Sequence, residues 1–192
     1  MPMLTKELFK KQKYIIPLFD VLQYSGFSNQ PNDDYVEVVS SEAADTQLCT
    51  IWGTDMSDNY QYETVTLKGQ TAVKTTKKWK TVVGVFLGDV YGKNSVAATG
   101  TITIRKDEGD AQITTIAANK RSTGNIRFLI RGLNITIFNA SGNLYYNTIE
   151  WPTADNSMTL TAAEKGYIRV EDYITFHSDG TGAAVQIMVW ED

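Results

Sequence analysis

The sequence predicts an all-β protein, an antiparallel β-sandwich or jelly roll with an N-terminal arm. Segments with alternating apolar and polar residues recur from Tyr35 onward. The connections between them are rich in Gly, Asn and Asp, and no long segment with helical periodicity lies among them. With 192 residues, 42% hydrophobic and 21% charged, the chain can bury a core and is not disordered by composition.

The first 34 residues differ in pattern, so we expect an arm over 1–34 and a β-sandwich domain over 35–192. A short helix is expected from Thr5 to Lys13, followed by a polar loop over 25–34. The arm carries too many apolar residues for a free tail. It therefore packs either on its own domain or on a neighbouring subunit. The residues that we expect at this contact are Ile15, Ile16, Leu18 and Phe19.

In the domain, alternation over short segments indicates half-buried strands. The segments are 35–40, 48–52, 62–67, 79–87, 101–104, 125–132, 133–138, 144–151, 167–170, 173–176 and 185–190. Turn-forming residues separate several consecutive segments, as hairpins require. Their spacing is too irregular for a repeat protein.

Composition argues against several partners. The formal net charge is −4 and the pI about 5.1, which is a poor match for a nucleic-acid backbone. No apolar stretch is long enough to span a membrane, and we expect no secretory signal. The single cysteine, Cys49, excludes an intrachain disulfide and fits folding in a reducing compartment.

The sequence offers little chemistry, and we expect neither an enzyme nor a bound cofactor or metal. Its only histidine, His177, has no recognisable nucleophile to activate, and Cys49 lies in an apolar strand. One histidine and one cysteine cannot build a zinc site. Two acidic loops, 55–58 and 107–110, leave a calcium ion open. A carboxylate pair for glycoside hydrolysis also stays open, because its members can come from distant strands.

Aromatic residues on the outward parity of strands form the second group of candidate contact residues. This group comprises Tyr60, Tyr62, Tyr146 and Trp190. Outward aromatics in β-proteins belong either to a covering layer or to a binding surface. For the group as a whole we expect at least one subunit or partner interface, so the chain is predicted to form a homo-oligomer, with a trimer favoured.

The segment from Ala44 to Val85 resembles a segment of virion structural proteins of tailed bacteriophages. The shared form is a strand, an acidic turn, and then the runs Glu63-Thr-Val-Thr-Leu-Lys-Gly69 and Thr71-Ala-Val-Lys-Thr75. Residues Gly100 to Asn119 look like the hairpin that follows in those proteins. The resemblance implies a β-sandwich on the capsid or near the neck and tail, without catalytic residues.

From this resemblance we expect a non-enzymatic head decoration (cement) protein that stabilises the capsid shell. The alternatives are a neck, tail or fibre component and a carbohydrate-binding β-sandwich module. The expected partners are the major capsid protein or other virion proteins and further copies of the chain, with a host glycan as another candidate. The expected location is the virion, assembled in the host cytoplasm.

Overall fold

The computed structural model describes residues 13–16, 27–90, 94–107, 111–123, 125–129, 133–139, 142–148, 157–171, 173–178 and 185–190. The regular elements in these ranges are β-strands, without an α-helix, which confirms the all-β prediction. Accordingly, the described residues include no helix of the length and apolarity that crossing a membrane requires.

The chain divides into two compact units. Unit 2 is Ser25–Thr123, and unit 1 combines Met1–Tyr24 with Gly124–Asp192. Unit 1 contains β1 (Lys13–Ile16), β9 (Asn125–Leu129), β10 (Leu133–Asn139), β11 (Leu144–Asn147), β12 (Met158–Leu160), β13 (Lys165–Val170), β14 (Tyr173–Ser178) and β15 (Val185–Trp190). Unit 2 contains β2 (Val36–Ser40), β3 (Leu48–Thr54), β4 (Tyr60–Thr66), β5 (Val73–Lys74), β6 (Thr81–Leu87), β7 (Ile102–Lys106) and β8 (Gln112–Ile116).

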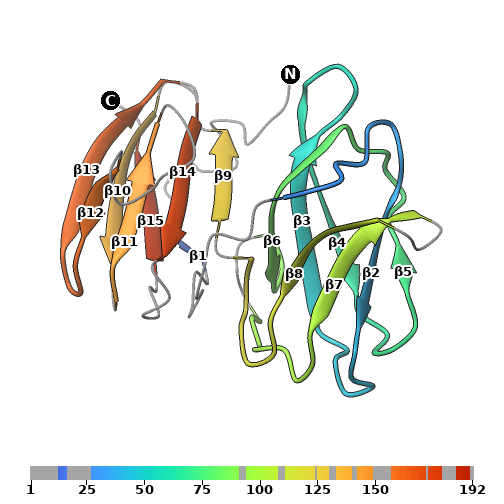
Figure 1. Ribbon diagram of the computed structural model, residues 1–192. Helices are drawn as coiled ribbons and strands as arrows, with labels where there is room; N and C mark the ends of the chain where they lie inside the picture. Colours follow the sequence, from blue (N-terminus) through green and yellow to red (C-terminus); the bar gives the residue numbers. More distant parts are fainter. Residues whose placement is uncertain are drawn as a thin grey trace. The chain divides into compact units, whose positions relative to one another are not determined.

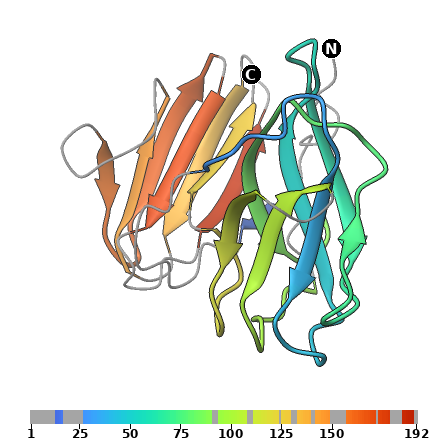
Figure 2. The same ribbon diagram turned by 45° about the vertical axis from the view of Figure 1, so that its right-hand side comes forward.

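Unit 1 has the strand order of a jelly roll. Its two four-stranded sheets are ordered β1-β15-β10-β13 and β12-β11-β14-β9 (Figures 1 and 2). Within this unit the first strand pairs with the last, the second with the seventh, the third with the sixth and the fourth with the fifth. This nested antiparallel pairing is produced when one long hairpin folds over into two sheets. The predicted jelly-roll character therefore belongs to unit 1.

Unit 2 is inserted in the jelly roll between its first strand, β1, and its second strand, β9. Its sheets are ordered β5-β2-β7-β8 and β4-β3-β6, and all the strand pairings are antiparallel. The two sheets enclose a core of Val, Ile, Leu and Trp side chains. Trp79 and Ile51 are fully buried in it. Unit 2 is thus a β-sandwich with a hydrophobic core of its own.

A buried carboxylate joins two connections of unit 2. Asp45, in the β2–β3 connection, is 1% exposed. Its oxygens accept hydrogen bonds from the Ser40 hydroxyl and from the backbone N–H groups of Thr99 (2.7 Å) and Gly100 (2.9 Å). Gly69 approaches the same connection with φ +56°, where an added Cβ would lie 2.6 Å from the carbonyl oxygen of Ala43.

The division of the chain differs from the predicted boundary between residues 34 and 35. Lys13–Ile16 form β1, which pairs with β15 as the edge strand of the jelly roll. Lys13 is therefore in a strand, not at the end of a helix, and residues 5–12 of the expected helix lie outside the described residues. The reason is a pairing between chain segments about 170 residues apart, which a local pattern cannot reveal.

Candidate functional site

One open edge of unit 1 is the strand β13. It pairs with β10 along one side, and among the described residues no strand pairs along its other side. Figure 1 shows β13 at the margin of its sheet. An unpaired strand presents backbone N–H and C=O groups that another strand can bind.

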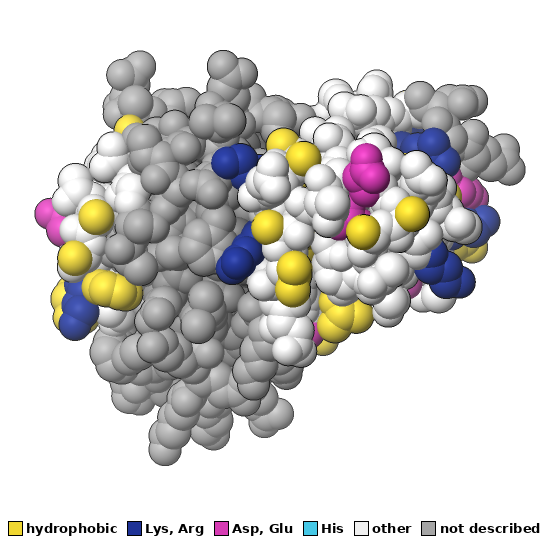
Figure 3. All heavy atoms as spheres, turned by 90° about the horizontal axis from the view of Figure 1, so that it is seen from below, with side chains coloured by type: hydrophobic (Ala, Val, Ile, Leu, Met, Phe, Trp, Pro, Cys, Tyr) yellow, Lys and Arg dark blue, Asp and Glu magenta, His cyan; other side chains and the backbone are white. Residues whose placement is uncertain are grey.

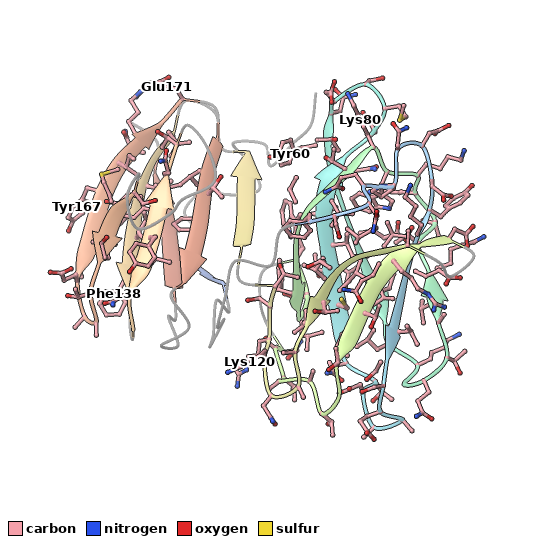
Figure 4. All side chains as sticks on the ribbon, in the orientation of Figure 1. Tyr60, Lys80, Lys120, Phe138, Tyr167 and Glu171 are labelled. Carbon is pink, nitrogen blue, oxygen red and sulfur yellow. The ribbon has the colours of Figure 1, made fainter. Side chains whose placement is uncertain are left out.

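Side chains alternate regularly along β13. Gly166 and Val170 are buried and Ile168 is partly buried, whereas Lys165, Tyr167 and Arg169 are exposed. Tyr167 is 70% exposed, the largest value among the exposed large hydrophobic residues of the described chain. Figure 4 shows Tyr167 on the outer side of unit 1. An aromatic ring so exposed on an edge strand is typical of a contact surface.

Charges of both signs flank this ring. Arg169 forms an ion pair with Glu171, with 2.7 Å between Nε and Oε1, and both side chains are largely exposed. Lys165, at the other end of the strand, is exposed as well. Hydrophobic and basic side chains also lie next to one another at the left end of the view in Figure 3. The edge thus carries an aromatic ring between Lys165 at one end and the Arg169–Glu171 ion pair at the other.

The neighbouring strand β10 adds to this face. Phe138 and Thr136 are opposite Lys165 and Tyr167 in the register of the two strands. Phe138 is partly buried and is labelled in Figure 4. Thr136 is 7% exposed, and its hydroxyl has no hydrogen-bond partner. The β10 side chains opposite Lys165 and Tyr167 are therefore less exposed than those of β13.

In unit 2, a segment of the same chain covers the edge strand β4. The Glu63 carboxylate on the edge strand β4 accepts hydrogen bonds from the backbone N–H groups of Thr76 (2.7 Å) and Lys77 (3.0 Å). The side chain of Gln61 donates to the carbonyl oxygen of Lys78 at 2.6 Å. The segment that follows β5 is thereby held along β4, which protects this edge against pairing with another chain.

Three of the four lysines in the segment 74–80 of unit 2 have acidic partners within the chain. Lys74 pairs with Asp107 at 2.9 Å and Lys80 with Asp58 at 2.7 Å. Lys78 lies 3.5 Å from a carboxylate oxygen of Asp33. The ammonium of Lys77 donates to the carbonyl oxygen of Tyr62 at 2.6 Å. Since most of these ammonium groups already have an acidic partner, the segment is a poor anion site.

The predicted contact residues Tyr60 and Tyr62 lie on β4 and are partly buried. The ring centroid of Tyr62 is 5.1 Å from that of Trp52, and the ammonium of Lys77 is 5.5 Å from the Tyr62 ring. Tyr62 therefore belongs to a layer that covers Trp52, one of the two interpretations that the sequence left open. Tyr60 is labelled in Figure 4.

The outward orientation predicted for Tyr146 is wrong. Tyr146 is 5% exposed, and burial raises the pKa of its hydroxyl. An added Cβ on Gly166 would lie 3.0 Å from this hydroxyl, which places Tyr146 on the inner side of the jelly roll. Tyr145 is the more exposed member of the pair. Two neighbouring tyrosines on a strand must point to opposite faces of the sheet, so the sequence shows that one of them faces outward. Which of the two does so depends on how β11 pairs.

The remaining predicted contact residues cannot be placed as side chains. Ile15 and Ile16 belong to β1 and Trp190 to β15, but their side chains lie outside the described residues, as do Leu18 and Phe19 entirely. Sequence reasoning overlooked Tyr167. The sequence contained the pattern that identifies it. In the predicted strand 167–170, Tyr167 alternates with the apolar Ile168 and Val170 and is therefore expected to face outward.

The candidates for chemistry belong to different units, Cys49 to unit 2 and His177 to unit 1. Cys49 is fully buried, and this burial raises the pKa of its thiol to about 12, so it is not a nucleophile at neutral pH. His177 belongs to β14, where its backbone is opposite Tyr145, and its side chain lies outside the described residues. In the described ranges, no three His, Cys, Asp or Glu residues form a group that could hold a metal ion.

In the first acidic loop, 55–58, the Asp55 carboxylate accepts hydrogen bonds from residues of the same turn. Hydrogen bonds from the side chain of Asn59 and from the backbone N–H groups of Asn59 and Ser57 lower the pKa of Asp55. These bonds shape the turn between β3 and β4. The second loop, 107–110, lies partly outside the described residues.

Neither a protein-family model nor a curated protein matches the chain. Several solved structures are similar to it, including ribosomal oxygenase YcfD, EutQ and YhaK. Ribosomal oxygenase YcfD from Escherichia coli has a TM-score of 0.33 and 6% identity over 78% of this chain and 40% of its own. EutQ from Salmonella typhimurium LT2 has a TM-score of 0.29 and 10% identity, and the match covers 76% of this chain and 96% of EutQ. YhaK from Escherichia coli has a TM-score of 0.29 and 12% identity, and the match covers 91% of this chain and 82% of YhaK. The chain thus spans about 40% of the length of YcfD.

These matches contradict the prediction of a head decoration protein, since none of the three is a virion protein. That prediction is withdrawn together with its neck, tail or fibre and carbohydrate-binding alternatives. At TM-scores of 0.29 to 0.33 the matches assign no activity in its place. The resemblance of 44–85 to phage proteins, the virion location and the expected partners are tested by none of these matches and stay predictions.

Proposed function

We propose that the chain is a non-catalytic assembly protein. In this proposal, unit 1 joins copies of the chain and carries unit 2 as an inserted module. The observation that carries it is the open edge strand β13 with Tyr167 70% exposed. Proteins without a need to pair at such an edge protect it, as this chain does at β4.

The side chains of β13 support self-association. The exposed ring of Tyr167 lies between Lys165 and the ion pair of Arg169 with Glu171. Such a surface can satisfy its charges and bury its ring against a surface of the same kind.

A catalytic role similar to that of YcfD lacks the necessary residues. YcfD has been solved with cobalt and 2-oxoglutarate. Non-haem iron oxygenases hold their metal with two histidines and one carboxylate. The chain has one histidine in its full sequence, so one copy cannot supply that set.

Sedimentation velocity over a series of protein concentrations tests the proposed function. We expect a concentration-dependent assembly of the full chain, which Tyr167→Ser weakens. Val96→Ser is a matched control, because Val96 is a 58% exposed hydrophobic residue in unit 2. A strict monomer up to the solubility limit would contradict the proposal.

A further inference from the structure

We infer that two copies of the chain pair through their β13 strands, antiparallel and with Ile168 opposite Ile168 of the second copy. This inference rests on the proposed function and names the partner and the register. The pairing joins two four-stranded sheets into one continuous sheet across a twofold axis. It builds even-numbered assemblies, in contrast to the trimer favoured from the sequence.

Strand length favours β13 among the edges of unit 1. β13 has 6 residues, whereas the other edge strands β1, β12 and β9 have 4, 3 and 5. A longer edge offers more backbone hydrogen bonds to a second strand. Gly166, Tyr167 and Ile168, at the middle of this edge, make no hydrogen bond to a neighbouring loop within the described chain.

The charges on β13 select the register. In an antiparallel pair centred on Ile168, Lys165 is opposite Glu171 of the second copy, and Glu171 is opposite Lys165. Tyr167 is opposite Arg169 of the second copy, which allows the guanidinium to lie against the ring. Opposite charges and cation–aromatic pairs directly across two strands stabilise a sheet. All four side chains are on the exposed parity of the strand.

The neighbouring registers are less favourable. Centring the pair on Tyr167 places Lys165 opposite Arg169, so like charges meet twice. Centring it on Arg169 places the two Arg169 side chains opposite each other on the axis. Like charges directly opposite destabilise a strand pair. Of the registers centred on Tyr167, Ile168 and Arg169, the one centred on Ile168 is the register in which opposite charges meet across the two strands.

Charge reversal tests this register in the full chain. Lys165→Glu places two acidic pairs in the interface, and Glu171→Lys places two basic pairs there. We expect each variant to raise the dimer dissociation constant roughly tenfold, because two symmetry-related pairs change sign. The double variant restores opposite charges and is expected to return the constant to within about threefold of the original. An equimolar mixture of the two single variants is expected to form heterodimers.

Lys68→Glu is the matched control, because Lys68 is an exposed lysine of unit 2. The readouts are the dissociation constant from sedimentation equilibrium and the melting temperature of each variant, which shows that the fold is retained. Lys165 and Glu171 are both exposed, so their replacement leaves the core intact.

The outcomes separate the register from the proposed function. Rescue by the double variant supports the register centred on Ile168. Tighter association in Lys165→Glu indicates the register centred on Tyr167 and overturns the inference. Assembly that is unchanged in all variants places the contact elsewhere, which overturns the inference and leaves the proposed function standing. Absence of assembly in the unmodified chain contradicts the proposed function itself.

Discussion

At the scale of single residues, Asp45 shows how a buried charge organises loops. Burial alone raises its pKa, but hydrogen bonds from Ser40, Thr99, Gly100 and Gln47 outweigh burial, and the pKa of Asp45 is lowered. The group therefore binds its proton less readily in the folded chain than in the unfolded chain, where its pKa is about 3.9. Ionised Asp45 stabilises the fold above that pH, and this stabilisation is lost as the pH falls through the folded-state pKa.

We expect Asp45→Asn to lower the free energy of unfolding by about 2 kcal/mol at neutral pH, because an amide cannot accept all these hydrogen bonds. The difference from the unmodified chain is expected to shrink as the pH falls below about 4, where Asp45 of the unfolded chain becomes protonated, and to go on shrinking down to the lower folded-state pKa. Urea unfolding over a pH series measures it. Asp58→Asn is the control, since Asp58 is an exposed partner of Lys80. A difference that does not change with pH would contradict this account.

A second residue-scale prediction concerns Thr114. This residue is 2% exposed on β8, opposite Ile104, and its hydroxyl has no hydrogen-bond partner. Because an unpaired buried hydroxyl is costly, we expect Thr114→Val to raise the free energy of unfolding by about 1 kcal/mol. Thr115→Val, at a partly exposed position, is expected to change it little. Chemical unfolding measures both variants, and a destabilised Thr114→Val would rule out this explanation.

At the scale of elements, the edge strands β4 and β13 differ in whether another segment of the chain covers them. Glu63 and Gln61 hold a segment of the same chain along β4, whereas β13 has no such cover among the described residues. Both strands alternate in sequence, so alternation alone does not distinguish a protected edge from an open one. The difference lies in hydrogen bonds between β4 and residues 13 to 17 positions further along the chain.

We expect Glu63→Ala to destabilise the chain by about 1 to 2 kcal/mol, because three hydrogen bonds to Thr76 and Lys77 are lost. It is also expected to increase aggregation, since the edge of β4 becomes accessible. Thermal unfolding and light scattering measure the two effects. Glu63→Gln keeps one acceptor oxygen and should lie between the two. Equal aggregation of all three proteins would show that this cover does not protect β4.

At the scale of the whole molecule, the chain is a jelly roll interrupted by a second sandwich. The strand pairings of β2 to β8 are all within Ser25–Thr123, and this unit has its own core. Unit 1, in contrast, depends on the pairing of β1 with β15, which joins segments about 170 residues apart in the sequence. The two units therefore differ in how far their contacts reach along the sequence.

We expect the fragment Ser25–Thr123 to fold alone and to unfold cooperatively, because its core and its strand pairings are internal. Fluorescence of the buried Trp52 and Trp79 during urea unfolding measures the transition. Deletion of residues 1–24, which removes β1, is expected to destabilise unit 1 and leave the transition of unit 2 in place. A fragment without a cooperative transition would show that unit 2 depends on the rest of the chain.

Local patterns in the sequence predicted much of the secondary structure. The segment 185–190 coincides with β15, and 48–52 and 133–138 fall within β3 and β10. Short strands such as β5 and β12 were missed, because two or three residues are too few to establish alternation. The candidate site was only partly predictable. Outward parity identifies Tyr167 as readily as Tyr60, but it does not show that β13 is an edge.

Residue types and local patterns are enough to predict that the chain is all-β, where most strands lie, and that one copy has too few histidines for a two-histidine metal centre. These properties depend on residue type and on neighbours a few positions away. Local patterns do not show that 13–16 are a jelly-roll strand, that unit 2 is an insertion, or which of Tyr145 and Tyr146 is buried. Each of these depends on pairing between distant segments, and such pairing is set by the packing of the whole sheet.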